Sequence, residues 1–388
     1  MSGTRRATVQ PLTNARLAEL AARHGTPLLV IDCEAIRRQY RSLSVALPGV
    51  DLFYALKPLP NREVVATLRA LGAGFDVATT GEIELVRAQR VAPGRCIHTH
   101  PIKRDADIGA ALRFGIRTFV VDNPDEIRKF ERFRGRAELL LRVSFRTPAA
   151  VVDLSRKFGC EPGAVPPLLE LARRLDVRVK GLSFHVGSQV ADPGRYVEAI
   201  DTCRELILHA AERGLGPLEM LDIGGGFPIP YGGRAEPIAR FCRPIRRELA
   251  TLPKTVRVIA EPGRFIAGPA GTCVTAVAGR AQREGRWWYY LDDGLYGSFS
   301  GQLYDHALYP IESLVRRGAR HPSVLAGPTC DSIDVIREDL PLPELRLGDL
   351  LVGRMMGAYT AATASDFNFI PRATIVAVNQ RPGARRAG

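Results

Sequence analysis

The chain has 388 residues, a length that fits one large barrel with a smaller partner, or two domains. Of these residues 46% are hydrophobic and 24% are charged, which is typical of a soluble protein. The net charge of +13 comes from arginines scattered along the chain, without the basic stripe that nucleic-acid binding requires. No apolar run approaches the ~20 residues of a membrane helix and no secretory signal is apparent, so we expect a cytoplasmic protein without a membrane partner. The seven cysteines form no CxxC pair, and we expect reduced, mostly buried thiols.

The first predicted element is a helix over 14–25, where Leu17, Leu20 and Ala21 recur at helical spacing and Gly25 can end the helix. After it, short apolar runs alternate with helical patterns. We expect strands at 28–32, 52–57, 74–78, 96–100, 118–122, 138–144, 181–188, 220–226 and 256–263. We expect helices at 61–72, 81–90, 104–114, 124–133, 163–175, 193–213 and 236–250.

Eight of these strands, from Leu52 to Gly263, are separated by helices and have continuous apolar runs, the pattern of parallel strands covered on both faces. The alternation predicts an α/β fold with a (β/α)8 TIM-type barrel over 28–268. An open doubly wound sheet is the alternative, disfavoured because no GxGxxG motif opens a helix after the first strand. Beyond about residue 270 the sequence predicts an all-β domain over 269–380, joined by residues 1–27, and a disordered tail over 381–388.

Polar or glycine residues close every predicted barrel strand. They are Lys57, Asp76, His98 with His100, Asp122, Arg142, His185 with Ser188, Gly224 with Gly225 and Gly226, and Glu261 with Gly263 and Arg264. Because the carboxyl ends of barrel strands form the active-site face, we expect these residues to share one pocket. A partly buried Lys57 in that pocket would have a lowered pKa, and its neutral amine could form a Schiff base.

The segments LDIGGGFPIPY and AEPGRF follow the seventh and eighth barrel strands, where barrels of this type bind phosphate. Glycines there let backbone N–H groups approach phosphate oxygens closely. A reactive lysine together with a phosphate cradle predicts pyridoxal 5'-phosphate, with Glu261 beside the ring nitrogen and His185 stacked on the ring. Each motif alone also has a plainer interpretation as a surface lysine or a turn, and His98 with His100 lacks a third ligand for a metal site.

Together these motifs resemble the fold-type III pyridoxal-phosphate decarboxylases of the ornithine decarboxylase group, which includes lysine and diaminopimelate decarboxylases. The resemblance runs from about residue 28 to residue 368. Its motifs are YALKPLPN, GFDVATTGEIELV, GLSFHVGSQ, LDIGGGFP, EPGRF, DDGLYGSF, YDH, GPTCDSID and MGAYT. It implies an alanine-racemase-like barrel with a β-domain, working as a head-to-tail homodimer with two active sites at the interface.

The resemblance also implies a role for each matching residue. Lys57 would carry the internal aldimine, Asp76 and Glu82 would support it, and Arg142 and Glu261 would surround the ring on which His185 stacks. Ser188, Gly226, Arg264 and Tyr359 would hold the phosphate. From the neighbouring subunit, Cys330 would protonate the substrate carbon after CO2 leaves and Asp331 would meet the distal amine. Tyr304 and Asp305 match a second contact to that amine, and Phe367 matches a pocket wall.

Three departures from the family pattern bear on substrate choice. His100 stands where asparagine is common, RVSFRTPAAVV lacks acidic residues, and Asp366 precedes Phe367. Asp331 favours a cationic side chain and repels the second carboxylate of diaminopimelate. We therefore expect decarboxylation of a basic amino acid, L-ornithine to putrescine in polyamine biosynthesis, with lysine or a specialised diamino acid as the alternative.

Two other classes remain as alternatives. A regulatory homologue that binds a protein partner would have lost the lysine, the glycines or the cysteine, all of which are present. A racemase on the same barrel would place an arginine at the ring nitrogen, where Glu261 stands.

Overall fold

The computed structural model describes residues 12–145, 157–232 and 236–380. By its internal contacts the chain divides into two units: Met1–Arg38 with Pro230–Arg234 and Ile266–Gly388, and Gln39–Ile229 with Ala235–Phe265. The expected tail over 381–388 lies outside the described residues. No described helix is both long enough and apolar enough to cross a membrane.

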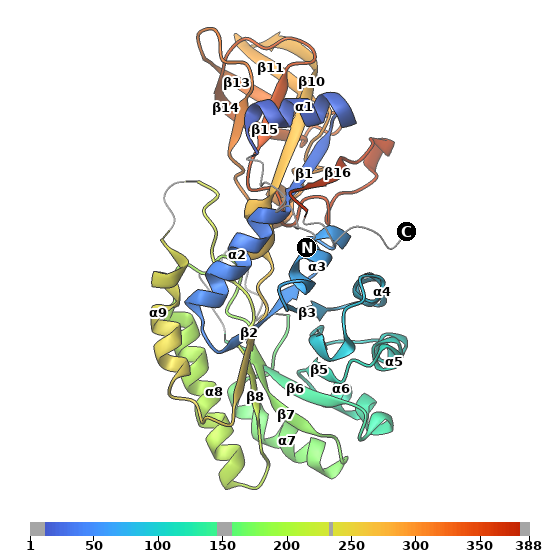
Figure 1. The fold of residues 1–388 in the computed structure, drawn as a ribbon, viewed down its shortest axis with the longest axis vertical. Helices are drawn as coiled ribbons and strands as arrows, with labels where there is room; N and C mark the ends of the chain where they lie inside the picture. The colour runs from blue at the N-terminus through green and yellow to red at the C-terminus, as the bar shows by residue number, and fades with distance from the viewer. Residues whose placement is uncertain (1–11, 146–156, 233–235, 381–388) are drawn as a thin grey trace, which may run out of the picture. The chain divides into compact units, whose positions relative to one another are not determined.

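The unit of Gln39–Ile229 and Ala235–Phe265 is a closed barrel of eight parallel strands, and the prediction of a TIM-type barrel is therefore confirmed. The strands are β2 (Val50–Ala55), β3 (Gly74–Val77), β4 (Cys96–His98), β5 (Thr118–Val121), β6 (Glu138–Val143), β7 (Val179–Phe184), β8 (Met220–Asp222) and β9 (Arg257–Ala260). The helices between them are α3 (Arg62–Arg69), α4 (Thr80–Ala88), α5 (Asp105–Phe114), α6 (Pro124–Lys129), α7 (Val165–Arg174), α8 (Gly194–Glu212) and α9 (Ile238–Leu249), and they surround the barrel (Figure 1).

Side-chain caps start several of these helices close to the strand that precedes them. The side chains of Asn61, Thr79 and Asn123 accept backbone N–H groups in the first turns of α3, α4 and α6. Such caps satisfy the unpaired donors at a helix start. They also keep the strand-to-helix loops short, which fixes the residues at the carboxyl ends of the strands.

The other unit contains a sheet of eight strands. They are β1 (Leu28–Asp32), β10 (Gly271–Arg283), β11 (Arg286–Leu291), β12 (Ile311–Ser313), β13 (His321–Ala326), β14 (Val335–Leu342), β15 (Leu350–Gly353) and β16 (Thr374–Val378). The described helices of this unit are α1 (Asn14–His24), the start of α2 (Cys33–Ala46), α10 (Arg264–Ala267), which begins in the barrel unit, and α11 (Gly301–Asp305). β1 lies between β10 and β16, with Leu28 paired to Val274 and to Thr374.

Two details differ from the sequence expectations. Residues 28–38 belong to the β-rich unit because β1 pairs with β10 and β16, whereas we expected a barrel that starts at residue 28. The helix α2 (Cys33–Ala46) and the strands β12 and β14 were not predicted.

Candidate active site

A ring of apolar side chains fills the centre of the barrel, and polar side chains stand directly beyond it. The apolar cluster takes one residue from each of six strands: Phe53, Ile97, Val120, Leu140, Met220 and Ile259. Alternate residues of a strand point to the same face. The residues two positions further along therefore also point inward, and they are Ala55, Thr99, Asp122, Arg142, Asp222 and Glu261. Asp76 joins this layer because it pairs in register with Ala55 and Ile97.

Lys57 continues the same inward alternation from Phe53 and Ala55, at the mouth of the barrel. Its side chain is exposed, so the expectation of a partly buried lysine is wrong. The carbonyl of Asp76 accepts the N–H of Leu56 at 3.2 Å, which ties the lysine loop to β3. The glycine of EPGRF approaches the same loop, since a Cβ on Gly263 would lie 2.7 Å from Cγ of Pro58.

Three carboxyl groups face Lys57. Burial raises the pKa of Asp76 to about 7, with Glu261 adding to the rise and Lys57 and Arg142 opposing it. Burial likewise raises the pKa of Glu82 to about 7, although the N–H of Ala78 donates to its Oε2 at 2.5 Å. Burial and the neighbouring Asp222 hold the pKa of Glu261 well above its usual range. Carboxyl groups with raised pKa values in one pocket indicate a site for acid–base chemistry.

His185 stands just beyond the end of β7, two residues after Ser183, which pairs in register with Arg142 and Asp222. Its Nδ1 accepts the N–H of Gly187 at 3.1 Å. Burial, followed by the positive charges of Lys57 and Arg142, lowers the pKa of His185 well below its usual value. The ring is therefore neutral, and it can lie flat against an aromatic ligand without repelling a cation.

His98 does not belong to this pocket. Because Ile97 points inward, His98 points to the helix side, where its ring stacks on Phe119 at 5.8 Å and is fully buried. Burial lowers the pKa of His98 to about 3, so the ring is neutral. The expectation that His98 closes the active-site face is therefore wrong. Among the residues that the structure describes, no group of three or more His, Cys, Asp or Glu side chains is arranged to hold a metal ion.

The loop Gly224–Gly226 has no room for a Cβ atom at any of its three glycines. A Cβ would lie 2.4 Å from the carbonyl oxygen of Phe184 at Gly224, 2.7 Å from that of Glu261 at Gly225, and 2.4 Å from that of Gly187 at Gly226. Gly224 and Gly226 also have φ values of 66° and 104°, in the left-handed region that favours glycine.

The carbonyl groups of these three glycines are all used by the protein. They accept from the N–H of Glu261 at 2.8 Å, the hydroxyl of Tyr196 at 2.6 Å and the N–H of Val190 at 3.0 Å. Of the hydrogen bonds made among the described residues, none uses the N–H groups of Gly225 and Gly226. Nearby, Nη2 of Arg264 donates to Oγ of Ser188 at 3.3 Å. Unused backbone N–H groups beside a guanidinium and a hydroxyl fit a phosphate group.

The remaining predicted residues lie in the β-rich unit, where Cys330 is the exposed one of seven free cysteines. The thiol of Cys330 donates to Oδ1 of Asn368 at 3.1 Å, and the hydroxyl of Tyr296 donates to Asp331. That hydrogen bond lowers the pKa of Asp331, so its carboxylate is ionised. The ring of Phe367 stacks on Tyr296 with centroids 4.4 Å apart.

The structure therefore groups Cys330, Asp331 and Phe367, and their predicted roles in the site stay predictions. It adds Tyr296 and Asn368, which lie in motifs that we quoted or beside them but to which we gave no role. Tyr304 is 61% exposed and Asp305 is half-buried, both on α11. Tyr359 is half-buried with a φ of 54°, and Asp366 is exposed and paired with Arg372 at 2.7 Å.

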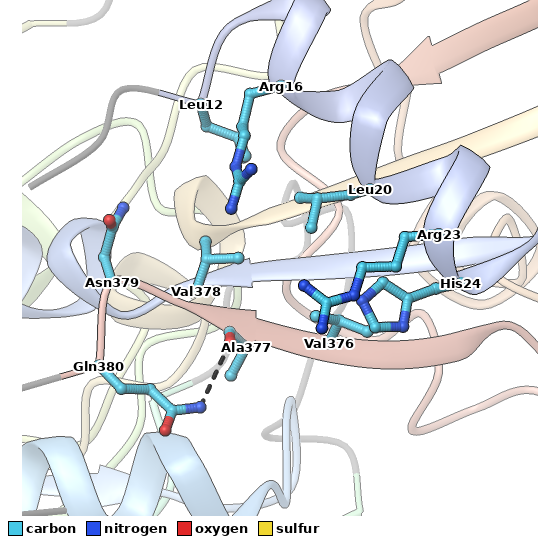
Figure 2. Close-up of a pocket in the computed structure, with 10 residues that line it drawn as sticks. All are labelled: Leu12, Arg16, Leu20, Arg23, His24, Val376, Ala377, Val378, Asn379 and Gln380. Carbon is cyan, nitrogen blue, oxygen red and sulfur yellow. Dashed lines mark hydrogen bonds between the residues drawn. The ribbon is translucent and has the colours of Figure 1, made fainter.

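A cavity of about 360 Å³ lies between α1 and β16 (Figure 2), and it contains none of the predicted site residues. Its lining residues are Leu12, Arg16, Leu20, Arg23, His24, Val376, Ala377, Val378, Asn379 and Gln380. The chemistry expected from the sequence is instead concentrated at the barrel mouth and in the Cys330 loop.

Comparison with known proteins agrees with a site for pyridoxal phosphate at the barrel mouth. Residues 33–268 match the family model described as pyridoxal-dependent decarboxylase, pyridoxal binding domain. The lysine/ornithine decarboxylase of Selenomonas ruminantium is 37% identical over 382 residues, which cover 97% of this chain and 97% of that protein. The ornithine decarboxylase of Mus musculus is 36% identical over 374 residues, covering 91% and 80%.

Solved structures are similar over nearly the whole chain. The crystal structure of lysine/ornithine decarboxylase complexed with cadaverine from Vibrio vulnificus has 54% sequence identity and a TM-score of 0.91, and the match covers 96% of this chain and 100% of that one. The structure of that enzyme complexed with putrescine gives the same values.

Proposed function

Because the chain belongs to the pyridoxal-dependent decarboxylases, we propose that it removes the α-carboxyl group of a basic L-amino acid as CO2, with L-ornithine as the main substrate and putrescine as the product. The observation that carries this proposal is the 54% identity, over 96% of the chain, to a lysine/ornithine decarboxylase. Pathway and location follow as parts of the same proposal. The diamine product belongs to polyamine biosynthesis, in the cytoplasm.

Pyridoxal phosphate supplies an aldehyde that bonds covalently to an amino group and a ring that withdraws the electron pair left when CO2 departs. Lys57 would be the amine that bonds to it, and Asp76 and Glu82 would be the carboxyl groups that balance the charge there. The phosphate would be bound by Ser188, Arg264, Tyr359 and the N–H groups of Gly225 and Gly226.

Around the ring, Glu261 would hold a proton at the ring nitrogen, consistent with its raised pKa. The neutral His185 would stack on the ring, and Arg142 contributes positive charge near Glu261. The thiol of Cys330 donates the proton that replaces the carboxylate at Cα. Its exposure and its hydrogen bond to Asn368 support a role at an interface rather than in a core.

Substrate recognition rests on the far end of the amino acid. The ionised Asp331 attracts a terminal ammonium group and repels the second carboxylate of diaminopimelate. Tyr304 and Asp305 form a second contact to that ammonium, and Phe367 forms a wall. Lysine is one methylene longer than ornithine, a difference worth about 1–3 kcal/mol in an apolar pocket, so we expect lysine to be a second substrate.

The protein works as a homodimer in this proposal, with Cys330 and Asp331 of one copy serving the Lys57 of the other. Mixing the inactive variants Lys57→Ala and Cys330→Ala tests the arrangement. Random exchange of subunits would give heterodimers with one intact site, and about a quarter of the wild-type activity would return. If both residues acted within one chain, no activity would return.

A substrate panel tests the reaction itself. The purified chain with added pyridoxal phosphate is incubated with ornithine, lysine, arginine, 2,4-diaminobutyrate or diaminopimelate, and CO2 and amine are measured. We expect putrescine from ornithine and slower formation of cadaverine from lysine. Cofactor uptake without CO2 from any substrate would favour a regulatory homologue that binds a protein partner.

A further inference from the structure

Thr99 makes a contact for which the reaction outlined above has no role. Its Oγ1 donates to Oδ1 of Asp76, which is 3% exposed. The contact follows from the sheet register. Asp76 pairs with Ile97, and Thr99 stands two residues later on the same inward face. The N–H of Thr99 donates to the carbonyl of Val77 at 3.2 Å, which fixes its backbone against β3.

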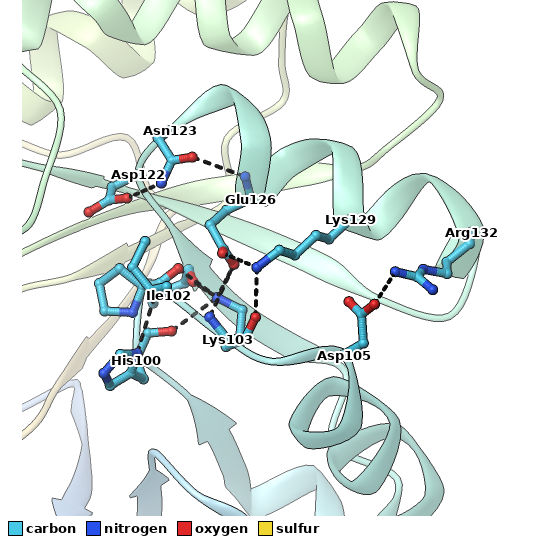
Figure 3. Close-up of polar contacts among 11 residues, drawn as sticks. His100, Ile102, Lys103, Asp105, Asp122, Asn123, Glu126, Lys129 and Arg132 are labelled. Atoms are coloured by element: carbon cyan, nitrogen blue, oxygen red, sulfur yellow. Dashed lines mark hydrogen bonds and ion pairs between the residues drawn. The ribbon is translucent and has the colours of Figure 1, made fainter.

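The loop that follows Thr99 is held by a buried ammonium group (Figure 3). The side chain of Lys103 has no exposed surface, and its Nζ donates to the carbonyls of His100 at 3.0 Å, Pro101 at 2.9 Å and Val120 at 2.6 Å. Glu126 lies 3.5 Å from the same nitrogen. Three carbonyls bound to one charged donor fix the loop that directly follows Thr99.

Charged and polar groups from several elements of the barrel mouth act on Asp76. The groups that act on it are Lys57, Glu82, Arg142, Asp222, Glu261 and the hydroxyl of Thr99. A hydroxyl that donates to a carboxylate favours its ionised form. Thr99 and the two cations therefore oppose the burial and the carboxyl groups that favour a protonated Asp76.

We propose that Thr99 is a positioning residue, whose hydroxyl holds the Asp76 carboxylate oriented and charged beside the nitrogen of Lys57. The proposal rests on the function proposed above, in which that nitrogen bonds to the cofactor. A negative Asp76 stabilises positive charge on the nitrogen, and its loss makes the nitrogen easier to deprotonate.

The experiment compares Thr99→Val, which keeps the shape and removes the donor, with Thr99→Ser, which keeps the donor. Thr80→Val is the matched control, because the hydroxyl of Thr80 donates to Asp107 at 2.9 Å outside the inward layer. For each holoenzyme, the visible absorption of the bound cofactor is titrated against pH, and kcat, KM and Tm are measured.

For Thr99→Val we expect the pH at the midpoint of the absorption change to fall by about one unit. We also expect kcat to fall about tenfold while KM stays within about twofold of the wild-type value. Thr99→Ser should restore the wild-type midpoint, and Thr80→Val should leave it unchanged. In an Asp76→Asn background, Thr99→Val should add no further shift. If Thr99→Val does not fold, Thr99→Ala removes the same donor and is judged by the same midpoint.

A change in Tm alone, with the wild-type midpoint and kcat, would overturn the proposal and leave Thr99 a structural partner of a buried carboxylate. Equal shifts in Thr99→Ser and Thr99→Val would overturn it as well. These results would leave the proposed function intact, because the wild-type protein would still bind cofactor and release CO2. A wild-type protein that takes up no cofactor would refute both proposals.

Discussion

Replacing Lys103 by methionine tests whether the buried ammonium group stabilises the barrel. The change keeps most of the apolar side chain and removes the donor from the carbonyls of His100, Pro101 and Val120. It also leaves Glu126, whose side chain is 4% exposed, with one cation fewer. Lys129 still contacts this carboxylate, so Glu126 is not left entirely unpaired.

The expected loss follows from two opposing contributions. Three hydrogen bonds from a charged donor contribute about 1.5–3 kcal/mol each, or about 5–9 kcal/mol together. Burial lowers the pKa of Lys103 to about 8, so burying the charged form costs about 3 kcal/mol, which methionine does not incur. The difference predicts that Lys103→Met lowers the free energy of unfolding by about 2–6 kcal/mol, a range that includes the values for breaking a buried ion pair.

Urea unfolding at neutral pH, followed by circular dichroism, measures this loss. The matched control is Lys129→Met, because Lys129 contacts the same carboxylate from a side chain that is 32% exposed, and we expect it to cost about 1 kcal/mol or less. Between pH 8 and about 10.4 the unfolded chain holds a proton on Lys103 that the folded chain has released. The stability of the wild type should therefore rise relative to Lys103→Met across that window. A cost no greater than that of Lys129→Met would refute the reasoning.

Further predictions concern the barrel mouth and the Cys330 loop. Gly225→Ala places a Cβ 2.7 Å from the carbonyl of Glu261, so it should weaken pyridoxal phosphate binding at least tenfold by equilibrium titration, whereas Gly163→Ala, with no atom within 4 Å, should not. Ser188→Ala should raise the Kd of pyridoxal phosphate about tenfold and leave that of pyridoxal, which lacks the phosphate, unchanged; equal losses for both would contradict a phosphate contact. Because burial raises the pKa of Asp76 to about 7, the folded chain holds a proton there that the unfolded chain releases above about pH 4. Without cofactor, the wild type should therefore lose up to about 4 kcal/mol of stability relative to Asp76→Asn as the pH rises from 4 to 7, and parallel pH profiles would contradict this. Asp331→Asn should raise the KM for ornithine more than tenfold while diaminopimelate becomes a better substrate than before, and an unchanged ratio of the two would exclude Asp331 from recognising the side chain.

The alternation of strands and helices was readable from the sequence because each buried parallel strand forms a short continuous apolar run. Because these runs are continuous, the sequence did not show at which residue each strand ends. The run 220–226 predicted a strand, but β8 ends at Asp222, and Gly224 has a left-handed φ that no strand continues. Lys57, His185 and Glu261 therefore stand on loops one or two residues past the ends of β2, β7 and β9, whereas Asp76, Arg142 and Asp222 lie inside their strands.

A strand that is buried on both faces also hides which face each residue takes. His98 was expected in the pocket because alternation could not be read in CIHTH, where both sides of the strand are apolar. Likewise, nothing in LLVID shows which sheet it joins, and β1 lies in the β-rich unit. The helix α2 could have been found, since Ile36, Tyr40 and Leu43 recur at helical spacing, whereas the charges and Pro341 of the edge strand β14 conceal it.

The sequence motifs identified most of the candidate site residues, because glycines, a lysine and carboxylates rarely occur together at strand ends outside a functional site. The partners of those residues were not readable. Thr99 contacts Asp76 across 23 residues and Tyr296 contacts Asp331 across 35, and hydrogen bonds at such separations leave no periodic signal.

The position of β1 between β10 and β16 has a consequence for synthesis of the chain. Leu28, Leu29, Val30 and Ile31 are completely buried, yet their strand partners are residues 271–274 and 374–378. During translation this apolar segment waits for the residues up to 271 before its antiparallel neighbour appears, and for the residues up to 374 before its parallel neighbour appears. The barrel strands β2 to β9 lie between β1 and β10 in the sequence, so the barrel can close before β1 is paired. The nascent protein therefore exposes an unpaired apolar strand to which chaperones can bind, and deletion of β16 would leave β1 without its parallel neighbour.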